Sequence, residues 1–278
     1  MKRWFKILFC SAALLMAGSA LLAQHRVDKK RLWEGEQRDR SYKRVKIFTY
    51  APDDGTNGSN PAVIILPGGS YRYLAINQEG FDVAKSFARR GYLAIVLRYR
   101  MGWFGAHYPD QLEDYRRAMD YVKANSASLG IDTTKIAVVG FSAGGHLAGC
   151  AALEENPKYR PAYVAMLYPV VTMREPYCHR MSKKNLLRGD TTLIPKLSLD
   201  ENIREDMTPV FLLHCEDDPI VKSNGSHSLA SELERKGVPC MVEFHQKGGH
   251  GFGVRAAKNS GARGWNDRFL KWIGTLQN

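Results

Sequence analysis

The stretch from Ile136 to Ala148 constrains the fold of this chain more than any other part of its sequence. A short apolar run ends at Gly140, Ser142 follows two positions later, and Gly144 opens a segment rich in alanine. A turn from strand to helix this tight tolerates only small residues beside the serine, and it projects the serine side chain from the edge of a sheet. The pattern therefore predicts a nucleophile elbow with Ser142 at its tip. A serine in an ordinary glycine-rich turn is the alternative interpretation.

Short apolar runs alternate with amphipathic segments on both sides of this turn. The run 62–66 is too short for a helix and is apolar throughout, which is typical of a parallel strand buried on both faces. The segment 110–127 instead repeats Leu112, Tyr115 and Met119 at helical spacing. Predicted strands are 45–50 at the sheet edge, 62–66, 92–97, 136–139, 163–167, 210–213 and 241–245, and predicted helices are 78–90, 110–127, 223–236 and 264–276. This alternation predicts an α/β fold: a doubly wound, mostly parallel sheet with helices on both faces.

Two segments depart from the alternation. Residues 24–41 are polar and charged, and we expect them to form a surface arm. Residues 172–206 mix Met, Arg, His and Pro with short Leu pairs, and we expect an insertion over the strand ends, where a substrate pocket is built. No internal repeat or linker divides the chain, so residues 24–278 are predicted to form one α/β domain, a size that a single core can support.

Residues 1–23 have the composition of a secretory signal peptide. Three basic residues precede an apolar run over 7–16, and small residues follow it. A membrane anchor is the alternative, but the apolar run is short for a span and the sequence after it is hydrophilic. We expect cleavage near Ala20 or Ala23 and export to the periplasm or the medium, without a stable membrane anchor.

The charge of the chain does not indicate a nucleic-acid partner. The formal net charge is +12, yet the basic residues are spread along the sequence without zinc-finger spacing or an RNA-binding aromatic motif. Four cysteines follow the predicted signal segment, and their scattered positions leave open whether any pair forms a disulfide. They are Cys150, Cys178, Cys215 and Cys240.

A serine nucleophile needs a base to take its proton and an acid to orient that base. His250 lies in a glycine-rich loop directly after the last predicted strand, where it can reach the sheet edge. Glu216, Asp217 and Asp218 directly follow another predicted strand, and their spacing favours Asp218 as the acid. The order serine, acid, histidine is that of α/β-hydrolases.

An oxyanion formed during acyl transfer needs backbone N–H donors, one just after the nucleophile and others in the loop after an early strand. These positions correspond to Ala143 and to Gly69 and Ser70. A plain Gly-Gly turn is the alternative for the second pair. Tyr71 and Tyr73 follow in the same loop, and we expect both to border the pocket, with Tyr71 binding substrate.

Two further histidines lie near the predicted site. His146, four residues after Ser142 and one turn up the helix, is predicted to be a packing and hydrogen-bonding residue. His214, at the end of a buried strand, is predicted to be satisfied by its own loop.

Together these motifs resemble the α/β-hydrolase esterases of the carbohydrate acetyl esterase type, which include acetyl xylan esterases and xylanase-like esterases. The resemblance covers nearly the whole chain after residue 23. The matching segments are 66–71, 96–100, 108–109, 140–148, 168–170, 184–187, His214 with Asp218, and 248–252. It implies that Ser142, Asp218 and His250 are catalytic. The family usually has a third glycine where this chain has Ser70, so a side chain stands beside the pocket here.

The resemblance implies a serine esterase that removes acetyl groups from carbohydrate, such as xylan or xylo-oligosaccharides, through an acyl-enzyme. Small-molecule or oligosaccharide esters are then the substrates, and neither a metal nor an organic cofactor is required. Ser70, the two tyrosines and the polar insertion favour short acyl chains over long ones. A prolyl oligopeptidase-like peptidase and a general carboxylesterase are the enzymatic alternatives, and an exported, non-catalytic carbohydrate-binding protein is the alternative of another class.

Overall fold

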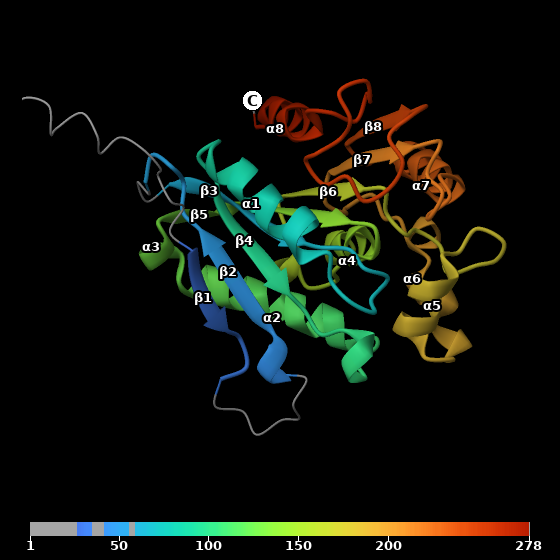
Figure 1. The fold of residues 1–278 in the computed structure, drawn as a ribbon, viewed down its shortest axis with the longest axis horizontal. Helices are drawn as coiled ribbons and strands as arrows, with labels where there is room; N and C mark the ends of the chain where they lie inside the picture. Colours follow the sequence, from blue (N-terminus) through green and yellow to red (C-terminus); the bar gives the residue numbers. More distant parts are fainter. Residues whose placement is uncertain (1–26, 35–41, 56–58, 278) are drawn as a thin grey trace, which may run out of the picture.

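The computed structural model of the chain describes residues 27–34, 42–55 and 59–277, so the predicted signal segment 1–23 lies outside the described residues. The described strands form one eight-stranded sheet in the order β1-β2-β4-β3-β5-β6-β7-β8 (Figure 1). Their bounds are β1 Val27–Arg31, β2 Lys46–Tyr50, β3 Asn60–Leu66, β4 Leu93–Arg98, β5 Ile131–Phe141, β6 Tyr163–Leu167, β7 Val210–Cys215 and β8 Cys240–His245. Strands β3 to β8 pair in parallel, whereas β1 and β2 are antiparallel. The predicted α/β class is confirmed.

The helices cover both faces of the sheet. A π-helical turn, Ile76–Phe81, leads into α1 Asp82–Ala88, which shares one core cluster with α8 Trp265–Thr275. The opposite cluster holds α2, α4 and α7 (Figure 1). The remaining helix bounds are α2 Asp110–Ala124, α3 Ser126–Leu129, α4 Ala143–Ala152, α5 Arg180–Leu187, α6 Ile194–Leu197 and α7 Asn224–Arg235.

The central strand β3 shows why a continuous apolar run was needed. Ile64 faces the cluster with α2 and α4, while Val63 and Ile65 face the cluster with α1 and α8, and all three are fully buried. Burying each such side chain contributes about 1.5–3 kcal/mol relative to leaving it exposed. The register pairs Leu66 with Gly140, so the loops that follow β3 and β5 leave the sheet side by side.

The edge of the sheet differs from the prediction. Residues 46–50 form β2, but β1 covers its outer side by pairing Val27 with Tyr50 and Arg31 with Lys46. Part of the expected surface arm 24–41 is therefore a strand, and 45–50 is not the edge. The sequence did not reveal this strand because β1 carries polar and charged residues, with 28–30 exposed, as is common in edge strands. Such a strand lacks the apolar alternation by which strands are found in a sequence.

The insertion 172–206 folds as α5, α6 and short turns, and it contacts the loops at the strand ends as expected. Asn185 Nδ2 donates a hydrogen bond of 2.9 Å to the carbonyl oxygen of Ser70. The Leu186 carbonyl accepts one of 2.9 Å from the Tyr108 amide. The insertion is thus attached to the loops after β3 and β4.

The four cysteines that follow the predicted signal segment are free thiols. Burial raises the pKa of the Cys215 thiol to about 12, so it stays protonated at neutral pH. No described helix has the length and apolar character needed to cross a bilayer.

Candidate active site

The turn between β5 and α4 places Ser142 at its tip. Ser142 has φ 53° and ψ −118°, a strained backbone conformation that side-chain-bearing residues rarely adopt. The residues two positions before and after Ser142 need to be glycine. A Cβ atom on Gly144 would lie 2.0 Å from the Leu66 carbonyl oxygen, and one on Gly140 would lie 2.1 Å from the Gly144 carbonyl oxygen. The Gly-x-Ser-x-Gly pattern is therefore explained by the close approach of backbone to backbone.

His250 bridges the serine and the acid. Its Nε2 lies 2.9 Å from Ser142 Oγ, and its Nδ1 lies 2.6 Å from Asp218 Oδ2. Because a carboxylate only accepts, Nδ1 carries the proton, which leaves Nε2 to accept from the serine hydroxyl. Gly249 and Gly251 flank the histidine with φ of 64° and 73°, which curves the loop back over the strand ends. The structure thus brings together Ser142, His250 and Asp218, the three residues predicted from the sequence to be catalytic.

The Asp218 carboxylate is held by more than the triad histidine. Its Oδ1 accepts from the amides of Ile220 and Val221 at 2.8 and 2.9 Å, and His214 Nε2 lies 3.2 Å from Oδ2. Burial raises the pKa of this carboxyl, but the hydrogen bonds from His214 and His250 outweigh burial and hold the pKa well below its usual range. Asp218 is therefore an anion across the physiological range.

The two neighbouring acids have other partners. Asp217 Oδ1 accepts from the amides of Gly248 and Gly249 at 2.9 and 2.8 Å, so it shapes the histidine loop without contacting the imidazole. Glu216 bonds to Ser223 and to His227 on the surface. Among the three acids, Asp218 contacts the His250 ring.

His214 was expected to be satisfied by its own loop, and that is only part of its role. Its Nε2 lies 3.0 Å from the Val221 carbonyl oxygen, which can only accept, so Nε2 donates and Nδ1 of the neutral ring accepts from the Ser226 hydroxyl at 2.7 Å. The same Nε2 contacts Asp218, so His214 supports the acid from beneath the triad. The sequence pattern that could have indicated this contact is the spacing of four residues between His214 and Asp218.

The loop after β3 lies directly against the serine. A Cβ on Gly68 would be 2.8 Å from Ser142 Cβ. Within the described part of the chain, no hydrogen-bond acceptor is engaged by the amides of Gly69, Ser70 and Ala143. These are the three donors expected from the sequence. Ser70 has φ 58°, a left-handed conformation in which glycine carries no steric penalty, so a serine here is tolerated at some cost.

Tyr71 differs from the expectation. Its side chain is 1% exposed and its hydroxyl lies 2.7 Å from His146 Nδ1, so it is part of the core and does not border the pocket as a substrate-binding residue. The left-handed φ of 58° at Tyr71 turns the side chain inward, which residue type alone could not indicate. Tyr73, 48% exposed, is the tyrosine of this loop that faces solvent.

His146 is a packing and hydrogen-bonding residue, as predicted. Its Nε2 lies 2.7 Å from the Leu197 carbonyl oxygen, which can only accept, so Nδ1 is left to accept from the Tyr71 hydroxyl. Burial lowers the pKa of His146 from 6.5 to about 4. The neutral ring therefore joins α4, the loop after β3 and the insertion.

This pKa predicts acid sensitivity. Because folding favours the neutral imidazole, its contribution is present above pH 6.5 and is lost as the pH falls from there through about 4, to a total of roughly 3 kcal/mol. Denaturant unfolding of wild type and His146→Gln at pH 7 and pH 4.5 measures it. The wild type should lose more unfolding free energy between the two pH values than the variant. Equal losses would contradict the assignment.

Glu79 is a buried acid that the sequence analysis did not identify. Its side chain is 3% exposed. Its Oε2 accepts from the Gly68 amide at 2.7 Å, and its Oε1 accepts from the Tyr168 hydroxyl at 2.9 Å. The Tyr168 oxygen in turn accepts from the Gly253 amide at 3.0 Å. The loop with the free amides and the loop with His250 are thus connected through two side chains. Burial raises the pKa of Glu79, against the opposing effect of the Gly68 and Tyr168 hydrogen bonds and of His250.

Removing this acid should therefore reduce activity. In Glu79→Ala, the Gly68 amide and the Tyr168 hydroxyl lose a buried partner, and we expect kcat to fall on the order of tenfold to a hundredfold. Glu79→Gln keeps an oxygen acceptor for Gly68 and should lose less. Steady-state kinetics on p-nitrophenyl acetate, with thermal unfolding of both variants, makes the comparison. Wild-type activity in Glu79→Ala would show that the connection has no part in ordering the loop.

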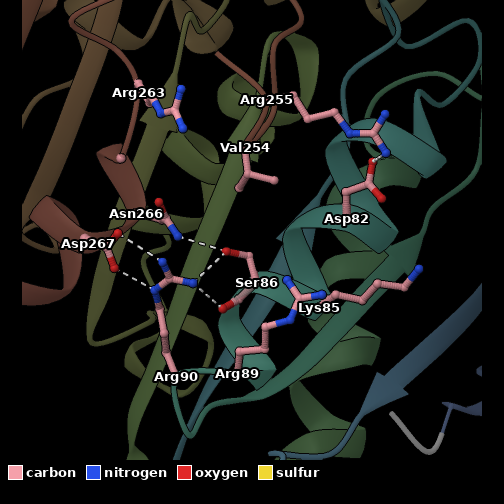
Figure 2. A pocket seen from close by; sticks show the side chains of 11 residues that line it. Asp82, Lys85, Ser86, Arg89, Arg90, Val254, Arg255, Arg263, Asn266 and Asp267 are labelled. Atoms are coloured by element: carbon pink, nitrogen blue, oxygen red, sulfur yellow. Dashed lines mark hydrogen bonds and ion pairs between the residues drawn. The ribbon is translucent and has the colours of Figure 1, made fainter. Parts of the chain in front are cut away.

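A separate polar hollow of about 400 Å³ lies between α1 and the segment around α8 (Figure 2). Two of the four guanidinium groups that line it are engaged: Arg90 bonds to Asp267 and to Ser86, and Arg255 pairs with Asp82. None of the three triad residues lines it. One ion pair joins the turn after α1 to α8, and the other joins the loop before α8 to α1.

The family follows from a match over most of the chain. The family model described as BD-FAE matches residues 49–233, which include Ser142 and Asp218. The chain belongs to the BD-FAE family of α/β-hydrolases. Membership confirms the resemblance to carbohydrate-type esterases drawn from the motifs.

Similar proteins of this family and fold act on esters or xylan, according to their names. Endo-1,4-beta-xylanase B of Butyrivibrio fibrisolvens is 29% identical over 79% of this chain and 36% of that protein. An acetylxylan esterase of Xylanibacter ruminicola is 28% identical over 76% of this chain and 44% of that protein. The chain thus spans less than half the length of either relative. The crystal structure of an acetyl ester-xyloside bifunctional hydrolase from Caldicellulosiruptor lactoaceticus has a TM-score of 0.81 at 29% identity, covering 93% of this chain and 99% of that one.

Proposed function

We propose that this chain is a serine esterase that removes acetyl groups from acetylated carbohydrate, with Ser142 as nucleophile. The observation that carries the proposal is the continuous path from Ser142 Oγ to His250 at 2.9 Å and from His250 to Asp218 at 2.6 Å, beside three unengaged amides. The relatives named as acetylxylan esterase and acetyl ester-xyloside hydrolase support the substrate class.

The first half-reaction forms an acetyl-enzyme. Ser142 Oγ attacks the ester carbonyl carbon while His250 Nε2 takes the hydroxyl proton, and Asp218 stabilises the imidazolium that results. The oxygen that becomes negative accepts from the amides of Gly69, Ser70 and Ala143. Collapse of the tetrahedral intermediate breaks the bond to the sugar oxygen, which leaves with the proton from His250.

The second half-reaction returns the free enzyme. A water molecule attacks the acetyl carbonyl carbon, with His250 now taking a proton from the water. The same three amides hold the second oxyanion. Collapse releases acetic acid, which loses its proton to water as acetate, and the proton on His250 passes to Ser142 Oγ. The cycle needs no group beyond the side chains and amides already described.

A short acyl chain suits the loops around Ser142. Ser70 adds a side chain at a position where the family usually has glycine, and Asn185 fixes the Ser70 carbonyl from the insertion. The insertion itself is polar and charged over much of its length, unlike the apolar lid that would hold a fatty chain. An open apolar groove would gain about 0.8 kcal/mol for each buried methylene, whereas a closed pocket gains little.

The test is kcat/KM for p-nitrophenyl acetate, butyrate and octanoate, together with acetate release from an acetylated xylo-oligosaccharide. We expect the values to fall with chain length and the sugar ester to release acetate. Values that rise toward octanoate, without acetate from the sugar, would make the chain a general carboxylesterase. A peptidase would instead cleave prolyl amides, and a non-catalytic sugar-binding protein would release nothing from any of these esters.

We also propose that the protein is exported, because residues 1–23 combine a basic start, a short apolar run and small residues. Mass spectrometry of the protein from the producing cell should find an N-terminus near Ala20 or Ala23. Met1 on protein from the cytosolic fraction would contradict export.

A further inference from the structure

Two aromatic side chains lie exposed beside the loop that carries the free amides. Trp103 is 64% exposed, the most exposed large hydrophobic side chain among the described residues, and Tyr73 is 48% exposed. Their ring centroids are 6.4 Å apart. Tryptophan and tyrosine lose favourable burial energy when left in water, so a paired exposure points to a binding surface.

Backbone hydrogen bonds attach both aromatics to that loop. The Tyr73 amide donates to the Gly69 carbonyl oxygen at 3.1 Å. The short helical turn Gly102–Phe104 follows β4. Its Gly102 amide donates to the carbonyl oxygen of Tyr71 at 2.7 Å, and its Trp103 amide donates to the carbonyl oxygen of Arg72 at 3.2 Å. The rings are therefore held at a fixed place relative to Gly69, which is one of the proposed oxyanion donors.

The surroundings of Trp103 are polar and include basic side chains. The Arg72 guanidinium lies 5.0 Å from the Trp103 ring centroid, a cation–π contact that limits the rotation of the ring. A groove of about 490 Å³ is lined by Gly102 and Ala106, and by Lys184, Asn185 and Arg188 in and just after α5. The groove therefore places lysine and arginine donors beside the turn that carries Trp103, whose ring is tilted by 57° to that of Tyr73.

This combination fits a chain of sugar rings. The C–H groups on one face of a pyranose form a slightly positive, apolar surface that packs on the negative face of an aromatic ring, while its hydroxyls reach lysine, arginine and amide donors. A fatty acyl chain would need a continuous apolar wall, which Lys184 and Arg188 interrupt.

We propose that Tyr73 and Trp103 form a sugar platform that binds the unreacted pyranose rings of the substrate while the acetyl group lies at Ser142. The platform rests on the proposed function and makes it more specific: the enzyme should prefer acetylated oligosaccharides over acetylated monosaccharides. Its contribution is to KM for the oligosaccharide, because the rings it holds do not change during acyl transfer.

The kinetic test compares wild type with Trp103→Ala, Tyr73→Ala and the conservative Trp103→Phe. The measured quantity is the ratio of kcat/KM for an acetylated xylo-oligosaccharide to that for p-nitrophenyl acetate. We expect the ratio to fall about tenfold in Trp103→Ala through KM, less in Tyr73→Ala, and to recover in part in Trp103→Phe. Leu276→Ala, at an exposed apolar residue just after α8, is the matched control and should leave the ratio unchanged.

Three results would overturn the platform. Equal losses on both esters would leave the ratio unchanged and mean a structural role, and unchanged kcat/KM for both esters would mean that the rings do not meet the sugar. A selective loss on p-nitrophenyl octanoate would make the surface an acyl site.

Binding of a xylo-oligosaccharide without acetyl groups, measured by calorimetry, separates the platform from the esterase activity. Wild type should bind it, and Trp103→Ala should bind it about tenfold more weakly. Binding without acetate release from the acetylated form would leave the platform standing and refute the proposed function. The absence of binding to wild type would refute the platform, whatever the esterase activity.

Discussion

Replacing Ser142 with alanine is expected to lower kcat for p-nitrophenyl acetate at least roughly a thousandfold while the protein remains folded. The hydroxyl is the group of this residue that lies within hydrogen-bond distance of His250, so its removal takes away the nucleophile and leaves the unengaged amides in place. Alanine also fits the elbow, because it has the same Cβ atom as serine and Gly68 leaves space for that atom. Thermal unfolding should change little.

Ser231→Ala is the matched control, because Ser231 is exposed on α7 and lies outside the triad. It should keep wild-type kcat. Residual activity of Ser142→Ala within about tenfold of wild type would place the nucleophile elsewhere.

Asp218→Asn is expected to lower kcat by about a thousandfold or more, and far more than Asp217→Asn. The Asp218 carboxylate accepts the His250 Nδ1 proton at 2.6 Å and stabilises the imidazolium; an asparagine can present its NH₂ group there and hold the ring in the wrong tautomer. Asp217 accepts from the amides of Gly248 and Gly249 in the loop that carries His250. In Asp217→Asn, the side-chain oxygen can still accept hydrogen bonds from these amides.

The two variants should also separate in stability. Asp218 additionally binds His214 and two backbone amides in the core, so Asp218→Asn should unfold at a lower temperature than Asp217→Asn. Kinetics and thermal unfolding measured on the same preparations give both comparisons. Equal losses of kcat, or the larger loss in Asp217→Asn, would show that the acid has been assigned to the wrong residue.

The triad could be predicted because each member lies in the loop or turn that follows a strand, buried for Ser142 and Asp218 and partly buried for His250. Ser142 follows β5, Asp218 follows β7 and His250 follows β8, and adjacent parallel strands end at the same edge of the sheet. Apolar runs found the strands, and the strands located the chemistry. The insertion 172–206 was found by the same reasoning, as a break in that alternation.

Other features depend on backbone conformation, which residue types do not reveal. Tyr71 is buried in a loop where three successive residues, Gly69 to Tyr71, adopt positive φ, although a tyrosine just after a glycine pair is typical of a pocket rim. Glu79 lies in the π-helical turn before α1, where an acid suggests a solvated helix start; its burial depends on Gly68 and Tyr168, from two other parts of the chain. β1 was missed because an edge strand need not be apolar.

The central claim is that Ser142 attacks the acetyl ester of a sugar, and labelling with a serine-directed phosphonate tests it most directly. The phosphonate resembles the tetrahedral intermediate, and peptide mapping by mass spectrometry identifies the residue it modifies. The account predicts a single adduct on Ser142, formed more slowly when an acetylated xylo-oligosaccharide competes for the site. An adduct on another residue, or a labelling rate that the oligosaccharide does not change, would contradict it.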